Sequence, residues 1–300
     1  RLGHMSEILP VIDARVPEFT DPEEKELDAL LVRTLSTHVR TAYHLTMEDA
    51  RDPTADTCSV LDTKAGGIGF VSKSEGLPKC QECGSPLSLV AQINLAQMPE
   101  EVQETLRLGD EGLIQVYMCY NNEGECESWE AFSGAHCVRF VEEDEMEEAR
   151  TREDVTHLYT LPTVNEDGEE VEHAEPFREC PISRVVRFTQ DYPKSEELSQ
   201  ALDCHPELGE EEREAIHEHA WERRQSPSSG LYIGGWFNWC QGIEYPDCPE
   251  CGQTMNGTVL NIESLDSEGQ IGLMFGDCGT AEICQCPTHE RQMTMVWACC

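Results

Sequence analysis

Apolar residues recur at helical spacing near the start of the chain, from Pro22 to about Thr46. Asp21 stands just before this stretch, where its carboxylate would cap the first turn of a helix. The positions that would share one stripe of such a helix are Leu27, Leu30, Leu31, Thr34, Leu35 and His38. The pattern predicts an N-terminal amphipathic helix over 22–46, after a short extended segment.

Short runs of β-forming residues follow, and turn residues separate them. They cover Leu87–Leu95, Leu113–Tyr120 and Cys137–Val141. Short strands between frequent turns are typical of a mostly antiparallel sheet. The sequence therefore predicts an α+β, β-rich fold.

The middle of the chain is acidic. The stretches Glu142–Asp154 and Asn165–Glu175 are predicted to be solvated loops or helix faces. Val185–Phe188 has the pattern of a strand, and Glu207–Arg223 has that of a polar helix after a His-Pro turn.

One signature occurs twice, 168 residues apart. A Gly-Gly pair at 66–67 precedes a Pro-x-Cys-x-Glu-Cys-Gly run at 78–84, and the second copy has them at 234–235 and 246–252. Seven of the nineteen positions from 66 to 84 are identical in the two copies. We infer an internal duplication that builds two related antiparallel lobes, in which strands at Thr258–Ile262 and Ile271–Phe275 would match those of the first copy.

These patterns divide the chain into five segments. Residues 1–5 resemble a tag remnant, 6–59 form an N-terminal helical segment, and 60–142 form the first zinc-knuckle repeat. Residues 143–225 are an acidic connecting insert with a strand and a helix, and 226–300 form the second zinc-knuckle repeat.

The first repeat offers four cysteines for one metal ion. Cys80 and Cys83 form a knuckle, in which two intervening residues let both sulfurs face one point. Cys119 and Cys126 complete a tetrahedral set if the loop between them folds back. The alternatives for the fourth ligand are His136 and Cys137.

The second repeat offers three cysteines and a histidine. Cys248 and Cys251 form its knuckle. Cys286 follows Gly279 by seven residues, just as Cys119 follows Gly112, and this offset favours Cys286 with His289 as the second pair. The reserve ligand is Cys284, which would lie on the same strand face as Cys286.

Closed sets of four ligands leave no open position for water or substrate, so two structural zinc ions are predicted. A redox dithiol would need a strand-to-helix junction and no further ligands, which fits neither copy. The sequence contains no GxGxxG context or P-loop, and it nominates no catalytic residue. The aromatic run 236–239 is predicted to pack in a core and not to line a ligand groove.

The net charge of −38 arises from 59 acidic and 21 basic side chains. A surface of this sign repels nucleic acid and anionic lipid, and it attracts a basic protein. No run of about eighteen apolar residues occurs, so no membrane span is expected. The chain has sixteen cysteines and no apolar signal segment, so a reducing cytoplasm is expected, in which clustered cysteines with a nearby histidine would bind metal. Most of the nine cysteines outside the two sets are expected to be small buried apolar residues.

These motifs resemble a known family. The first Gly-Gly pair and CxxCG run, the Gln-Ile-Asn at 92–94 and the run 112–119 resemble the YwqG-like family, a bacterial domain of unknown function. They are also similar to the eukaryotic programmed cell death protein 2 and its ribosome-biogenesis relatives. In the second copy, 234–236, 248–252, 275–277 and 286–289 match the YwqG-like pattern. The resemblance covers about half of the chain.

The resemblance implies a pseudo-twofold, β-rich fold of two related halves. Its eukaryotic members are chaperones that hold a newly made basic ribosomal protein, whereas its bacterial members have no settled activity. Together with the charge, it favours a non-enzymatic, chaperone-like or protein-interaction module for a basic client. The alternatives are an enzyme with a pocket between the halves and an immunity-type inhibitor of a basic toxin.

Overall fold

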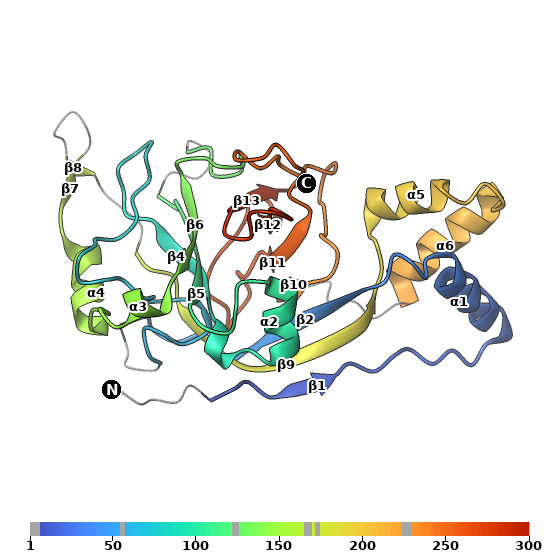
Figure 1. Cartoon of the computed structure of the whole chain (residues 1–300), viewed down its shortest axis with the longest axis horizontal. Coiled ribbons are helices and arrows are strands. Elements are labelled where there is room, and N and C mark those ends of the chain that lie inside the picture. The colour runs from blue at the N-terminus through green and yellow to red at the C-terminus, as the bar shows by residue number, and fades with distance from the viewer. Residues whose placement is uncertain are drawn as a thin grey trace.

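A single large sheet organises the molecule, seen here in a computed structural model (Figure 1). The structure describes residues 7–54, 58–121, 126–164, 170–171, 175–223 and 230–299. The strand order is β13-β12-β11-β10-β2-β9-β3-β4-β5-β6, with β1 beside β9. Every pair is antiparallel except β1 with β9, so the predicted β-rich, antiparallel fold is confirmed.

Two strands that are distant in sequence form the centre of the sheet. They are β2 (Arg40–Met47) and β9 (Glu179–Asp191), which pair along almost the whole of β2. Beyond β9 lie β3 (Lys64–Gly66), β4 (Ser88–Asn94), β5 (Leu113–Met118) and β6 (His136–Val141). Beyond β2 lie β10 (Leu231–Gly234), β11 (Gly257–Glu263), β12 (Thr280–Gln285) and β13 (Met293–Ala298).

On each side of the central pair, four strands therefore follow one another outward in chain order. We call β3–β6 the first half-sheet and β10–β13 the second half-sheet. Both bury one face in a common core that contains residues such as Ile93, Val116, Leu260 and Ile283. The two outermost strands, β6 and β13, pack against each other, so the ends of the sheet approach closely.

Most helices lie at the two ends of the sheet (Figure 1). At one end α1 (Pro22–Thr34), α5 (Ser195–Asp203) and α6 (Glu210–Arg223) share a small apolar cluster around Leu31, Leu202 and Ile216. At the other end are α3 (Glu143–Met146), α4 (Arg152–Thr160) and the hairpin β7 (Thr163–Val164) with β8 (Glu170–Val171).

The remaining elements run along the sheet. A 3-10 turn (Leu95–Gln97) and α2 (Glu100–Leu106) follow β4, and α2 packs on β10 and β11. The N-terminal strand β1 (Val11–Asp13) lies along the outer side of β9. Among the described residues, no helix combines the length and apolarity that crossing a bilayer requires.

The predicted helix over 22–46 is only partly correct. The helix begins as expected, with the Asp21 carboxylate accepting hydrogen bonds from the amides of Glu23 and Glu24, but it ends at Thr34. Residues 40–47 form β2 instead. This strand pairs with β9 and β10, and such long-range partners leave no mark on local helical periodicity.

The predicted strand at Ile271–Phe275 is wrong. Within this segment only Leu273 forms a bridge, to Leu265, and the positive φ angles of Gly272 (84°) and Gly276 (53°) interrupt extended backbone. The strand that matches β5 is β12. The other predicted strands are observed. Those at Cys137–Val141, Val185–Phe188 and Thr258–Ile262 lie within β6, β9 and β11, whereas β4 and β5 are shorter than the predicted Leu87–Leu95 and Leu113–Tyr120. Helix α6 begins three residues after the predicted start at Glu207.

Some predictions fall on residues without a described structure. The proposed tag remnant 1–5 lies outside the described residues, and so does most of the acidic stretch 165–175. The acidic stretch 142–154 contains α3 and the start of α4, as expected for helix faces.

Candidate metal centres

Both CxxC runs fold into the same tight loop. In the first, the amide of Cys80 donates to the carbonyl of Ser85 (2.8 Å), and the amide of Gly84 donates to the carbonyl of Cys80 (3.0 Å). In the second, Cys248 and Gly252 make the same two bonds, each at 2.8 Å, with Gln253 and Cys248 as acceptors. Gly84 and Gly252 have φ angles of 76° and 70°, which glycine adopts without strain.

The four predicted cysteines of the first repeat lie together. The Sγ atoms of Cys80, Cys83, Cys119 and Cys126 are all within 4.8 Å of one another, and those of Cys83 and Cys119 are 3.6 Å apart. Cys83 is half-buried and the other three are buried. We call this group the first centre. Four sulfurs at this spacing could hold one metal ion.

The predicted set of the second repeat also lies together. The Sγ atoms of Cys248, Cys251 and Cys286 and a ring nitrogen of His289 are within 4.8 Å of one another. His289 Nδ1 is 3.6 Å from Cys248 Sγ, and its Nε2 is 3.6 Å from a carboxylate oxygen of Glu250. A carboxylate behind a metal-binding histidine fixes the orientation of the ring. We call this group the second centre, and it could also hold one ion.

The alternative ligands lie elsewhere. The buried ring of His136 is 3.2 Å from the carbonyl of Ser128 and 3.1 Å from the hydroxyl of Thr294. Neither Cys137 nor Cys284 belongs to a ligand group among the described residues. Metal binding by the eight residues remains a prediction, but the geometry selects the expected set over its alternatives.

In each knuckle the environment favours the thiolate, the form that binds metal, at the first cysteine. A hydrogen bond from Cys119 lowers the pKa of Cys80 to about 5, with help from the backbone amides of Cys83 and Glu82. Burial raises the pKa of Cys248, but hydrogen bonds from His289 and from backbone amides outweigh it and lower the value to about 6. Each knuckle therefore has one cysteine prepared to ionise.

The Gly-Gly pairs form the turns that follow β3 and β10. A side chain at Gly67 would meet the carboxylate of Glu179 at 2.4 Å, and one at Gly235 would meet that of Asp191 at 2.5 Å. Both acids are fully buried on β9, and Glu179 forms an ion pair with the buried Lys64 (3.2 Å). Sequence reasoning missed these carboxylates, because they stand at the two ends of a strand that also contains arginines and other polar residues, and nothing local marks them as buried.

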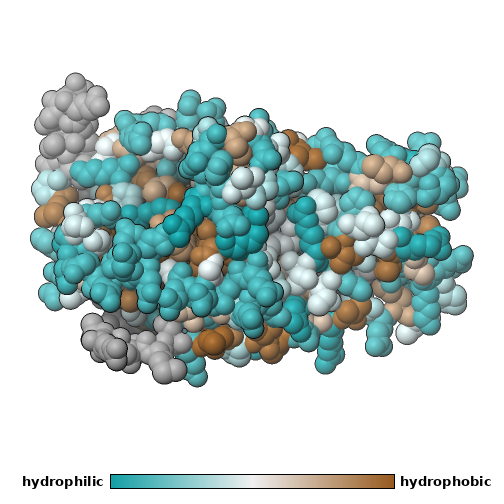
Figure 2. Space-filling view, in the orientation of Figure 1, coloured by the Kyte–Doolittle hydropathy of each residue, from teal (hydrophilic) through white to brown (hydrophobic). Residues whose placement is uncertain are grey.

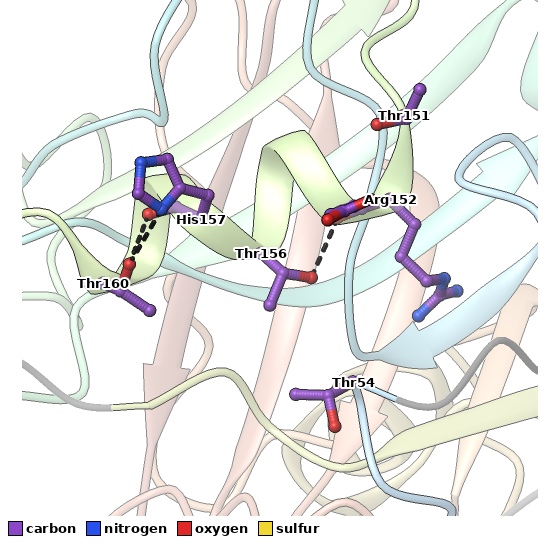
Figure 3. Close-up of a pocket in the computed structure, with 7 residues that line it drawn as sticks. Thr54, Thr151, Arg152, Thr156, His157 and Thr160 are labelled. Carbon is purple, nitrogen blue, oxygen red and sulfur yellow. Dashed lines mark hydrogen bonds between the residues drawn. The ribbon is translucent and has the colours of Figure 1, made fainter.

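Two of the pockets lined by described residues are large enough for a small ligand. One, of about 670 Å³, lies beside α4 (Figure 3). Its lining comprises Thr54, Thr151, Arg152, Glu153, Thr156, His157 and Thr160. Thr156 and Thr160 donate their hydroxyls to carbonyls of their own helix. The Arg152 guanidinium is bound to Glu179 at 2.9 Å and is not free for a ligand.

The other pocket, of about 500 Å³, lies where α2 meets β2, β10 and β11. Its lining includes Arg40, Tyr43, Glu101 and Glu104. Among the described residues, neither pocket is lined by a cysteine, so neither offers a thiol nucleophile. The aromatic run behaves as predicted, because Phe237 and Trp239 are buried in an apolar cluster.

Comparison with known proteins identifies one family. The model of a family described as "Domain of unknown function (DUF1963)" matches residues 63–285, which is most of the chain. A search of curated proteins gave no match. The matched region contains both knuckles and all strands from β3 to β12.

Proposed function

The chain belongs to the DUF1963 family of domains of unknown function, and from its own residues we propose a non-enzymatic cytoplasmic module that holds a basic protein partner. Two structural zinc ions would stabilise this module. The observation that carries the proposal is the closure of both ligand groups, since each supplies four protein ligands.

Zinc fits both donor sets. Four sulfurs, or three sulfurs and one imidazole, are the usual ligands of structural zinc, and an open catalytic site would contribute only three. Metal analysis of protein purified without added zinc tests the proposal. We expect about two zinc ions per chain, and a protein that folds fully without metal would contradict the structural role.

The matching halves support the proposed duplication. Matching strands occupy matching places on the two sides of β2 and β9, and the two knuckles share their hydrogen bonds at an offset of 168 residues. We therefore propose a pseudo-twofold ancestry in which the segment before each repeat contributes one strand of the central pair. On the same grounds we propose kinship with the YwqG-like proteins and with programmed cell death protein 2.

The acidic surface supports a basic partner. The net charge is −38, and hydrophilic side chains dominate the face shown in Figure 2. Such a field accelerates encounter with a cationic surface and would keep a basic client soluble. Pull-down from the native host at low and high salt tests this. We expect a basic protein that is released by salt, and capture of only acidic or salt-insensitive proteins would contradict the proposal.

A further inference from the structure

The loop that connects the first centre to β6 crosses the seam between the two half-sheets. We call residues Cys126–Ser133 the seam loop. The Trp297 indole donates to the hydroxyl of Ser128 (3.1 Å), and the amide of Phe132 donates to the hydroxyl of Thr294 (2.7 Å). Since Cys126 is a member of the first centre and both other contacts reach β13, the loop is fixed at several points.

Phe132 is exposed in this fixed loop. Its side chain is 43% exposed, and its φ angle of 60° lies in the left-handed region that bulky residues avoid. Trp129 is half-buried, and its ring meets that of Trp297 edge-on at 5.9 Å. Neither the core nor the backbone conformation explains a phenylalanine at position 132. Strain of this kind is characteristic of binding sites.

Two acidic residues belong to the same loop. Glu127 and Glu130 are exposed, and neither carboxylate forms a salt bridge within the part of the chain that the structure describes. A short loop that exposes both an aromatic ring and two carboxylates suits a guanidinium, which binds rings by cation–π attraction and carboxylates by forked hydrogen bonds. The loop is already ordered, so binding would cost little conformational entropy.

We propose that the seam loop binds an arginine side chain of the basic partner, with Phe132 as the aromatic surface and Glu127 and Glu130 as the counter-charges. This inference rests on the proposed function for the nature of the partner. It adds the place of contact and the residue that is recognised.

A dye-labelled peptide of alternating arginine and glycine, followed by fluorescence anisotropy, tests the inference. Phe132→Gly removes the ring, keeps the net charge and suits the left-handed backbone. We expect it to bind the peptide about 3- to 10-fold more weakly while its thermal stability is equal to or higher than that of the wild type. In a control peptide, citrulline, the neutral isostere of arginine, replaces each arginine. We expect the wild type and Phe132→Gly to bind this peptide with equal affinity.

The carboxylates need a charge-matched control. Glu127→Gln with Glu130→Gln removes two charges from the seam loop, and Glu210→Gln with Glu211→Gln removes two exposed charges from α6. We expect only the first pair to weaken binding clearly. If the wild type does not bind the arginine peptide, the proposed basic partner fails. If it binds, but the seam-loop variants match the α6 control, the proposed function stands and this inference is overturned.

Discussion

Each half-sheet carries a row of mostly polar side chains, and the two rows differ in how far their polar atoms are hydrogen-bonded. Register places one residue from each strand side by side, on the face away from the common core. In the first half-sheet the row is Lys64, Gln92, Gln115 and Arg139. In the second half-sheet it is Tyr232, Asn261, Glu282 and Val296.

In the first row the side-chain amide of Gln92 is fully hydrogen-bonded. The Gln92 amide donates to the carbonyls of Val60 and Asp62, both at 2.9 Å. Its oxygen accepts from the amide of Phe70 (3.0 Å) and from the side chain of Gln115 (2.7 Å). A buried amide with four partners stabilises one unique arrangement.

The second row is less complete. Neither side-chain polar atom of the buried Asn261 has a hydrogen-bond partner among the described residues. Glu282 replaces a neutral amide with a buried acid, and it accepts one hydrogen bond from Thr280 (2.9 Å). The comparison shows that one scaffold can hold a fully paired amide in one half, and in the other an amide without a described partner beside an ionisable acid.

The two candidate metal centres differ in how far their ligands are buried. Three of the four cysteines in the first centre are buried, whereas Cys251 of the second centre is exposed and His289 is half-buried. Water and chelators therefore have better access to the second centre. We therefore expect the second half-sheet to respond more strongly to pH, through Glu282, and to chelators, through its candidate metal centre.

Loss of a metal ligand should have the largest effect. We expect Cys80→Ser to lower the free energy of unfolding by several kcal/mol, because a structural zinc ion contributes on the order of 10 kcal/mol. Cys248→Ser should cost less, since water can reach the ligands that remain. Zinc content and thermal denaturation measure both. Cys204→Ser, at an exposed cysteine outside both centres, is the control. A larger loss in Cys248→Ser would reverse the comparison.

The next largest effect concerns pH. Burial raises the pKa of Glu282 from 4.5 to about 8. Between these values the unfolded chain is ionised while the folded protein keeps its proton, so stability falls as the pH rises from 4.5 to 8. Glu282→Gln removes this loss. We expect it to be more stable than the wild type by about 2–4 kcal/mol at pH 8 and by little at pH 4.5.

Denaturant unfolding across this pH range measures the difference. Glu268→Gln removes an exposed carboxylate and should leave the pH dependence of the wild type unchanged. Burial also raises the pKa of Glu263 to about 7, so part of the same loss should survive in Glu282→Gln. If the free energy of unfolding depends on pH in the same way in Glu282→Gln and in the wild type, then burial does not raise the pKa of Glu282 in the folded protein.

The sequence predicted the membership of the two ligand groups better than the fold around them. Cysteine spacing is local, and the glycine offset linked Cys119 and Cys286 without knowledge of the sheet. All eight predicted ligands lie in the two groups for that reason. The pairing of β2 with β9 joins residues that are more than 130 positions apart in the chain, and local sequence patterns do not record such contacts.

The polar rows could not be predicted for a related reason. Gln92 and Asn261 occur at matching places in strands that were both expected. Three of the four partners of Gln92 are backbone groups of loops, whereas Asn261 has no partner among the described residues. Phe70 reaches Gln92 only because the chain turns at Gly66 and Gly67 and then runs back over the sheet. The hydrogen bonds of a buried amide follow from tertiary structure, and residue type alone does not determine them.

The smallest expected difference separates the two amides themselves. Gln92→Ala removes four hydrogen bonds and leaves buried partners unpaired, so we expect it to lower the free energy of unfolding by about 2–3 kcal/mol. Asn261→Ala breaks no bond to a described residue, and it should cost about 1 kcal/mol or less. Chemical denaturation of both variants at one pH measures the two costs. Equal costs would mean that the folded protein in solution satisfies the Asn261 amide as fully as that of Gln92, and the contrast between the half-sheets would then rest on Glu282 alone.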